Sequence, residues 1–290
     1  MKVSVLSGKG GVGKSSITAS LALTLSNSND LVCVDCDVET PDLGLFFGLK
    51  EKDYKKREVS TGLKAELIED KCIKCRKCVE SCAFSAISWE DKPVFNKFLC
   101  EGCGVCDLVC PAKAISMNPI QNGWIGHAET ERFPLVMGHL GIGESGSGEI
   151  VALVKEEAEK IAHNQNRDWI LLDSAAGIGC PVIASIAGSD YVIAITEPTP
   201  AALHDLGRAL ALVNHFKMPY GIVINKANLN PKMTKKIHSF SKKKQAKVLA
   251  EIPYDKAFVD SLVELKPAVS HKKELEETFV ELKENLLSDL

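Results

Sequence analysis

Eight of the eleven cysteines stand in two runs of identical spacing, and that spacing is typical of iron–sulfur ligands. The first run is Cys72, Cys75, Cys78 and Cys82, and the second is Cys100, Cys103, Cys106 and Cys110. In the C-x2-C-x2-C-x3-C pattern, three thiolates bind one four-iron cluster and the fourth binds the cluster of the other run. The sequence therefore predicts two [4Fe–4S] clusters, held by Cys72, Cys75, Cys78 and Cys110 and by Cys82, Cys100, Cys103 and Cys106.

The N-terminal segment carries a phosphate-binding loop directly after a short apolar run. Its residues are Gly8, Lys9, Gly10, Gly11, Val12, Gly13, Lys14, Ser15 and Ser16. The glycines let successive backbone N–H groups face phosphate oxygens at a helix N-terminus. Lys14 is expected to contact the β- and γ-phosphates, and Ser15 is expected to bind Mg²⁺ through its hydroxyl.

Carboxylates follow two further apolar segments, as such a loop requires. Asp35 and Asp37 close the segment 31–35 on the same side, because alternate residues of a strand point the same way. Asp173 ends the segment 169–172, which is the Walker B form that binds Mg²⁺, here expected through a water molecule. Parallel strands bind ligands beyond their carboxyl ends, so these acids are expected to position water or Mg²⁺ there.

The segment 224–228 resembles the base-recognition loop of GTPases, with one change. Reading guanine requires a carboxylate that accepts from its N1–H and N2–H groups, and Asn228 stands at that position. Adenine is therefore favoured, with Asn225 as the expected base contact and Pro253 as a wall of the base pocket. The expected nucleotide is ATP.

Apolar and amphipathic segments alternate in the parts of the chain outside the cysteine runs. The apolar ones, expected to be buried parallel strands, are residues 2–6, 31–35, 169–172, 191–195, 221–224 and 248–252. Helical patterns lie between them, for example over 13–26 and 201–216. A hairpin is expected from 124–129 and 134–140. This order predicts an α/β fold with a doubly wound, mostly parallel sheet.

The cysteine-rich segment interrupts this order and is expected to be a separate domain. The stretches AFSAISW and PAKAISM follow their runs at the same distance, which indicates an internal repeat. We expect an inserted bacterial-type ferredoxin subdomain of α+β structure over 70–118, with the nucleotide-binding domain split into 1–69 and 119–290. An insertion whose ends lie close together is tolerated in a surface loop.

Charge and composition narrow the possible partners. A net charge of -3 gives no general reason to expect nucleic-acid binding. The longest apolar runs are too short to span a bilayer, so no membrane insertion is expected. Eleven cysteines without an export signal favour metal ligation in a reducing cytoplasm. The last helix, over 271–290, has an acidic polar side and is expected to pack on the core, and Cys180 is expected to be a small buried residue.

Taken together, the motifs resemble one family, the MinD-superfamily P-loop ATPases that contain an inserted ferredoxin domain. The similarity extends through 100–106, 177–183, 196–200 and 251–255 and covers nearly the whole chain. It implies that Lys9 crosses a dimer interface to the partner's nucleotide, as in the MinD and ParA ATPases and the nitrogenase iron protein. It also implies that Asp37 orients the attacking water, that Asp35 supports the site and that Gly177 senses the γ-phosphate.

The leading hypothesis is an ATPase, acting alone or stimulated by a partner, whose nucleotide-driven dimer switch is coupled to electron transfer through the two clusters. Lys9, Lys14, Asp37 and Asp173 are the residues expected to take part in Mg²⁺-dependent hydrolysis. The dimer is expected to be a homodimer or a heterodimer with a paralogue, and the redox partner is not identified. Two alternatives stay open: an iron–sulfur assembly or carrier ATPase, and a MinD- or ParA-like positioning ATPase whose clusters sense redox state.

Overall fold

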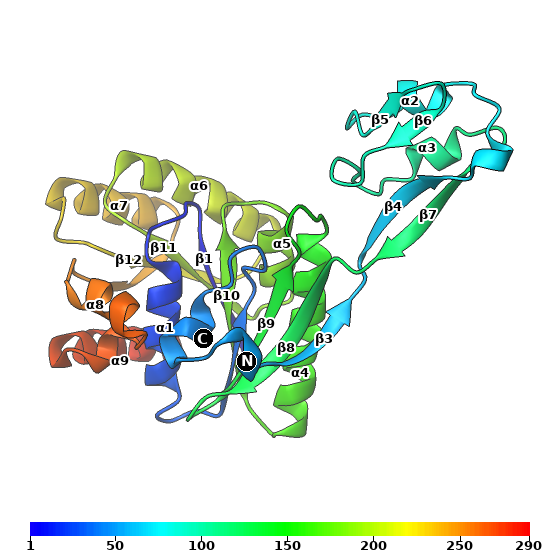
Figure 1. Ribbon diagram of the computed structural model, residues 1–290. Helices are drawn as coiled ribbons and strands as arrows, with labels where there is room; N and C mark the ends of the chain where they lie inside the picture. Colours follow the sequence, from blue (N-terminus) through cyan, green and yellow to red (C-terminus); the bar gives the residue numbers. More distant parts are fainter. The chain divides into compact units, whose positions relative to one another are not determined.

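The computed structural model describes residues 1–290, which form two compact units (Figure 1). The larger unit comprises residues 1–57, 125–139 and 147–290, and we call the second one, residues 58–124 and 140–146, the cysteine unit. The expected insert, 70–118, lies inside the cysteine unit. The unit is wider because flanking strands and the segment 140–146 pack with the cysteine-rich part.

A nine-stranded sheet runs through the larger unit, in the order β13-β12-β11-β1-β10-β2-β9-β8-β3. The strands are β1 (Lys2–Ser7), β2 (Leu31–Asp35), β3 (Lys55–Val59), β8 (Gly123–Glu129), β9 (Pro134–Leu140), β10 (Trp169–Ala176), β11 (Tyr191–Thr196), β12 (Tyr220–Ile224) and β13 (Lys247–Glu251). Pairing from β13 across to β9 is parallel. The predicted fold class, a mostly parallel doubly wound sheet, is confirmed; β2 and β11 are buried along their whole length, and β1 is buried from Val3 onward.

Helices cover both faces of this sheet (Figure 1). They are α1 (Lys14–Leu25), α4 (Ser147–Asn164), α5 (Cys180–Ile186), α6 (Pro200–His215), α7 (Pro231–Lys243), α8 (Ala257–Glu264) and α9 (Lys273–Leu287), with short 3-10 turns η1 (Leu43–Phe47), η2 (Glu51–Asp53) and η4 (Ala268–Ser270). In α9, Leu275, Phe279, Leu282 and Leu286 are buried against α1 and β13. The last helix therefore packs on the core, as its acidic polar side indicated. None of the helices combines the length and the apolar character needed to cross a membrane.

The predicted hairpin is part of the large sheet, because one of its strands pairs with β2. Strands β8 and β9 are joined by a turn in which the Thr130 N–H donates to the Phe133 carbonyl, and β9 then pairs in parallel with β2. Gly138 is required there because a Cβ at this position would lie 2.6 Å from Val154 and 2.9 Å from Ile150 of α4. The close packing of α4 on β9 thus extends the parallel sheet beyond β2.

The cysteine unit is built from two similar halves. Its elements are β4 (Gly62–Leu67), η3 (Glu69–Lys71), α2 (Lys77–Glu80), β5 (Ile87–Trp89), β6 (Pro93–Phe95), α3 (Val105–Leu108) and β7 (Ile115–Ile120). β4 pairs with β7 and β5 pairs with β6, both antiparallel. Helix α3 begins 28 residues after α2, at Val105 and Lys77 respectively, and left-handed residues recur at the same offset, so the internal repeat is confirmed.

One buried asparagine holds the outer segment of the cysteine unit in place. The Asn122 side chain is 1% exposed, accepts from the Thr61 N–H at 2.9 Å and donates to the Ser145 carbonyl at 2.8 Å. It therefore joins the chain before β4 and the segment 140–146 to the end of β7. This contact explains why the unit includes residues on both sides of β8 and β9.

Candidate functional site

The phosphate loop lies beyond the carboxyl end of β1, between the neighbouring strands β10 and β11. Gly11 and Gly13 have φ of +79° and +93°, in the left-handed region that glycine adopts without strain. A Cβ on Gly8 would lie 2.3 Å from the Asp205 carbonyl oxygen, so this glycine is required by a close approach to α6. The loop thus has the backbone curvature and the location that a phosphate site requires.

Lys14 and Asp173 form a buried ion pair at the centre of this edge. Lys14 Nζ lies 2.8 Å from Asp173 Oδ1, and the Thr18 hydroxyl donates to the same oxygen at 2.8 Å. Burial lowers the pKa of Lys14, but the carboxylates of Asp173, Asp35 and Asp37 together outweigh it, so the pKa lies above its usual value. The other oxygen, Asp173 Oδ2, is buried without a hydrogen-bond partner. An unsatisfied carboxylate oxygen here fits the Walker B role, since Mg²⁺ or its bound water would satisfy it.

Asp35 and Asp37 both reach the site, but their environments differ. Asp35 is 1% exposed and accepts from the N–H groups of Asp37 at 3.0 Å and Leu43 at 2.9 Å. Burial and the nearby Asp173 raise the pKa of Asp35 well above its usual range. Asp37 is partly exposed, and burial raises its pKa while Lys14 opposes the rise. Asp35 therefore shapes the loop that follows β2, while Asp37 is partly exposed and accepts from the Thr40 hydroxyl at 3.3 Å.

A third carboxylate, Asp42, is absent from the residues expected from the sequence. It immediately precedes η1, and its carboxyl group lies near the Ser15 hydroxyl. Burial raises the pKa of Asp42. The loop after β2 thus brings a carboxylate close to the Ser15 hydroxyl that is expected to bind Mg²⁺, and Lys14 Nζ lies 3.4 Å from the same hydroxyl. No sequence motif marks Asp42, because the contact arises from the path of that loop.

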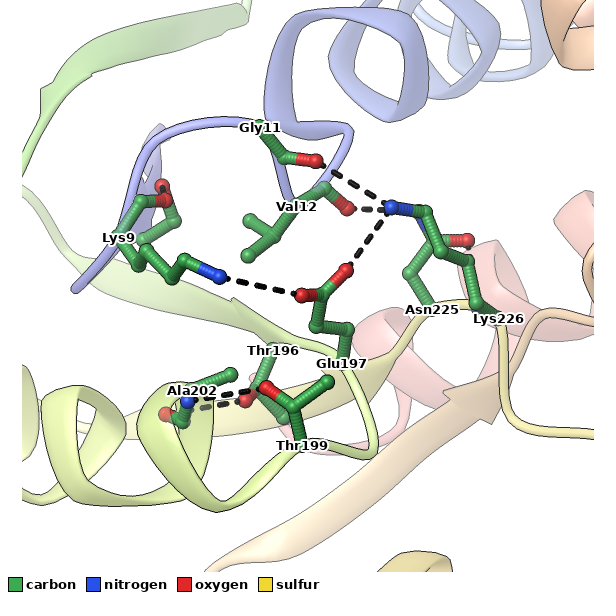
Figure 2. A network of polar contacts seen from close by, with 10 residues as sticks. Lys9, Gly11, Val12, Thr196, Glu197, Thr199, Ala202, Asn225 and Lys226 are labelled. Atoms are coloured by element: carbon green, nitrogen blue, oxygen red, sulfur yellow. Dashed lines mark hydrogen bonds and ion pairs between the residues drawn. The ribbon is translucent and has the colours of Figure 1, made fainter. Parts of the chain in front are cut away.

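Figure 2 shows a polar network that joins the phosphate loop to β11 and β12. Glu197, just after β11, lies 3.4 Å from Lys9 Nζ and 2.8 Å from Lys226 Nζ. Lys226 also donates to the Gly11 carbonyl at 3.3 Å. Burial raises the pKa of Glu197, but the two ammonium groups outweigh it and hold the pKa below its usual value. Lys9 is 42% exposed, so the lysine expected to cross a dimer interface is bound to its own chain only at its tip.

The side chain of Asn225, the expected base contact, is used within the same network. Its Nδ2 donates to the Val12 carbonyl at 2.7 Å, and its Oδ1 accepts from the Lys226 N–H at 2.9 Å. It still borders a hollow of about 260 Å³ together with Gly13, Ser16 and Pro253. The opposite wall of this hollow comes from α8, through Phe258, Val259 and Leu262. The sequence indicated the first wall but not the second, because α8 has no motif beyond its apolar residues.

Gly177 and Cys180 follow the end of β10 and were both singled out from the sequence. Gly177 has φ of +99°, and its N–H donates to the Ser7 carbonyl at 2.8 Å, beside the phosphate loop. Cys180 begins α5 and is exposed, so the expectation of a buried residue is wrong. The reason is local: helix α5 buries Val182, Ser185 and Ile186, and Cys180 lies in its first turn, on the outside.

In the cysteine unit, the eight cysteines of the two runs surround two separate small hollows. Cys72, Cys75, Cys78 and Cys110 line the first, and Cys82, Cys100, Cys103 and Cys106 line the second. Each hollow thus receives three cysteines from one run and one from the other. No three such side chains converge closely enough to hold a single metal ion. Four thiols around a hollow suit a four-iron cluster, which is larger than one ion.

The backbone around the hollows matches the same chemistry. The N–H groups of Ala86 and Ala114 each donate to a cysteine sulfur, Cys82 Sγ and Cys110 Sγ, at 3.3 Å. Burial raises the pKa of the Cys106 thiol to about 11. Without a metal this thiol stays protonated at neutral pH, whereas ligation requires the thiolate and supplies the charge that stabilises it. What fits iron–sulfur ligation is the arrangement itself: two sets of four thiols, each with one N–H···S hydrogen bond.

Comparisons with known proteins agree with this architecture. The chain belongs to the CbiA family, the CobQ/CobB/MinD/ParA nucleotide binding domain, whose model matches residues 3–268. It is a MinD-like P-loop protein with a ferredoxin-type cysteine insert. It is 36% identical over 233 residues to the uncharacterized protein MJ0578 of Methanocaldococcus jannaschii, covering 79% of each chain.

Two further relatives and one solved structure extend the comparison. Pyruvate synthase subunit PorD of Thermotoga maritima is 38% identical over 78 residues, which are 25% of this chain and 79% of that protein. The iron-sulfur cluster carrier protein of Pyrococcus furiosus is 25% identical over 233 residues, 77% of this chain and 60% of the carrier. The cell division ATPase MinD of Pyrococcus furiosus shares the fold, with a TM-score of 0.61 at 19% identity over 99% of this chain and 98% of MinD.

Proposed function

We propose that this protein is an ATPase whose Mg²⁺-dependent nucleotide cycle controls electron transfer through two [4Fe–4S] clusters. The observation that supports it most is the pairing, in one chain, of a phosphate loop closed by Lys14 and Asp173 with two hollows that each receive four cysteines. A cluster pair supplies one-electron chemistry, and a P-loop supplies a conformational cycle. The cytoplasm is the compartment that suits both, since its thiols stay reduced.

Nucleotide binding begins, in this account, with the exchange of two contacts. Lys14 leaves Asp173 and the Ser15 hydroxyl for the β- and γ-phosphates, which frees Ser15 to bind Mg²⁺. Mg²⁺ held by Ser15, and through water by Asp173, would neutralise the phosphate charge and satisfy Asp173 Oδ2. Asp37, the more exposed of the two acids after β2, orients the water that attacks the γ-phosphate. Gly177 reports the γ-phosphate by breaking its bond to Ser7.

Dimer formation requires a third exchange, at Lys9. In the monomer the Lys9 ammonium is held at 3.4 Å by Glu197, which also binds Lys226. When ATP is bound, Lys9 reaches the phosphates of the partner chain, and Glu197 keeps its second partner. The contact to Glu197 is long and partly exposed, so breaking it costs little. The partner is a second copy or a paralogue.

The ATP affinity of the oxidised and the reduced protein tests this proposal. If nucleotide state changes the clusters, then cluster oxidation state must change ATP affinity by the same factor. We expect the anaerobically purified protein to bind ATP with Kd values that differ by about fivefold or more between its oxidised and dithionite-reduced forms. The variant Asp37→Asn, in which binding is retained and hydrolysis is lost, keeps turnover from obscuring the result. Equal Kd values in the two forms would contradict the coupling.

A second function, delivery of iron–sulfur clusters, has its own support in the similarity to the Pyrococcus furiosus carrier protein. The eight crossed cysteines argue for clusters that stay in place, because removing one cluster takes ligands from both runs. Transfer of ⁵⁵Fe-labelled cluster to an apo-acceptor separates the two. ATP-dependent loss of label from this chain would favour delivery, and retention through many rounds of hydrolysis would favour electron transfer.

A further inference from the structure

The two cysteine sites share a backbone but differ in charge. Every residue of the first run has its counterpart 28 residues later, as Cys82 has in Cys110. The first run contains the cations Lys74, Arg76 and Lys77 with one acid, Glu80, whereas the second contains only the acids Glu101 and Asp107. The hollows are nearly equal in size, and each has one N–H···S bond of 3.3 Å. Charge is therefore the main difference between two otherwise matched sites.

The cations of the first site are free to meet a partner. We define the basic face as Lys71, Lys74, Arg76, Lys77 and Lys113, which lie in or beside the segments that line the first hollow. All five are exposed, and none forms an ion pair. The ion pairs of this unit are made by other lysines, Lys64, Lys92 and Lys97. Arg76 is additionally held over the Trp89 ring at 4.4 Å.

An exposed apolar side chain, Ile73, and an exposed cysteine, Cys75, lie among the residues of the basic face. Ile73 lines the first hollow and is 64% exposed, and Cys75 beside it is exposed as well. The wall of the first hollow therefore reaches solvent where the cations gather. A small apolar centre with a charged surround is typical of brief redox encounters, which bury less than about 1,200 Å².

We propose that the basic face is the docking site for an acidic one-electron carrier protein, which exchanges an electron with the cluster in the first hollow. The inference rests on the proposed function, because the face serves exchange only if that cluster is present. The exchange moves one electron and no proton: the reduced cluster loses one electron and the carrier's metal centre gains it, or the reverse. Opposite charges increase the encounter rate and orient the carrier toward Ile73 and Cys75.

A nucleic acid is the other ligand that a cluster of cations suggests, and the face fits it poorly. Single-stranded nucleic acids stack their bases on aromatic side chains, and the segment 71–77 contains none. The Trp89 ring is covered by Arg76. Charge complementarity with an acidic protein is therefore the better match.

The test measures electron exchange between the anaerobic holoprotein and two probes, an acidic plant-type [2Fe–2S] ferredoxin and a basic cytochrome c. The test variant carries Lys71→Glu, Lys74→Glu and Lys77→Glu, leaving Arg76 on Trp89. The control variant carries Lys232→Glu, Lys235→Glu and Lys236→Glu, three exposed lysines of α7 in the larger unit. Both variants change the net charge equally. Iron and sulfide counts establish that each still holds its clusters.

We expect the exchange rate with the acidic probe to fall about tenfold or more in the test variant at low salt and to stay unchanged in the control. The wild-type rate falls with rising salt, and the rate with cytochrome c falls in neither variant. Equal rates for wild type and test variant, equal losses in both variants, or salt-sensitive binding of a single-stranded oligonucleotide abolished in the test variant would overturn the proposal. Missing clusters in the wild type would instead contradict the proposed function.

Discussion

The two units hold themselves together in different ways. The larger unit buries aliphatic side chains of its strands and helices completely, for example Leu6 of β1, Ile17 of α1 and Leu135 of β9 at 0% exposure. The main buried cluster of the cysteine unit consists of Ala65, Cys78, Ile87 and Ile115, packed against four further cysteines and the partly buried Val79, Phe95 and Met117. Short elements and so small an apolar core give little stability by themselves. The difference indicates that ligands stabilise one unit and apolar burial stabilises the other.

Removing the iron is the change expected to separate the stabilities of the two units most strongly. We expect chelation under anaerobic conditions to lower hydrogen-exchange protection in β4 and β7 by about a hundredfold or more, since ligation supplies much of that unit's stability. Protection of β1, β10 and β11 and the affinity for ATP are expected to stay unchanged. Equal protection of β4 and β7 with and without iron would show that the small core is sufficient.

The stability of the larger unit is expected to depend strongly on one polar contact, the buried ion pair of Lys14 and Asp173. We expect Lys14→Met to abolish ATP hydrolysis and to lower the free energy of unfolding by about 3 kcal/mol, because Asp173 is left as an uncompensated buried charge. Adding Asp173→Asn is expected to restore most of the stability and none of the activity. Urea denaturation measures the stability of the single and the double variant, and an ATPase assay measures their activity. A single variant as stable as the wild type would contradict the role of the pair.

The base hollow tests whether α8 belongs to the nucleotide site. Leu262 lines the hollow and Val263 does not, although both are aliphatic and exposed, at 54% and 77%. We expect Leu262→Ala to weaken ATP binding about fivefold, by roughly 1 kcal/mol of lost apolar contact. Val263→Ala serves as the matched control and is expected to bind as the wild type does. Equal effects of the two substitutions in calorimetry would place the base elsewhere.

The smallest expected effect concerns Glu197 and pH. Because Lys226 and Lys9 hold its pKa below the usual 4.5, the folded protein gains stability above that pH and loses it as the pH falls through the lowered value. We expect Glu197→Gln to cost about 0.5–1 kcal/mol at pH 7 and to show a weaker loss of stability in acid. Parallel stability curves for the two proteins down to pH 3 would contradict this assignment.

The sequence predicted those parts of the molecule that depend on neighbouring residues. The phosphate loop, the position of Asp173 on a buried strand and the crossed cysteine sets follow from local spacing, although β10 continues past Asp173 to Ala176. Glu197 could not be predicted, because it acts through Lys9 and Lys226 on segments far away in the chain. The same holds for Asp42, for the wall formed by α8 and for the pairing of β9 with β2, all of which arise from tertiary packing. Cys180 was assigned wrongly because exposure depends on how α5 is turned.

The claim that joins the two units is that the nucleotide state changes the clusters. Anaerobic redox titration followed by electron paramagnetic resonance measures it directly, on the holoprotein with MgATP, with MgADP and without nucleotide. The account predicts that ATP changes the ratio of reduced to oxidised cluster at a fixed potential by about tenfold, a shift of ~59 mV for a one-electron couple. In Lys14→Met this shift is expected to vanish. Superimposable titrations in all three nucleotide states would contradict the account.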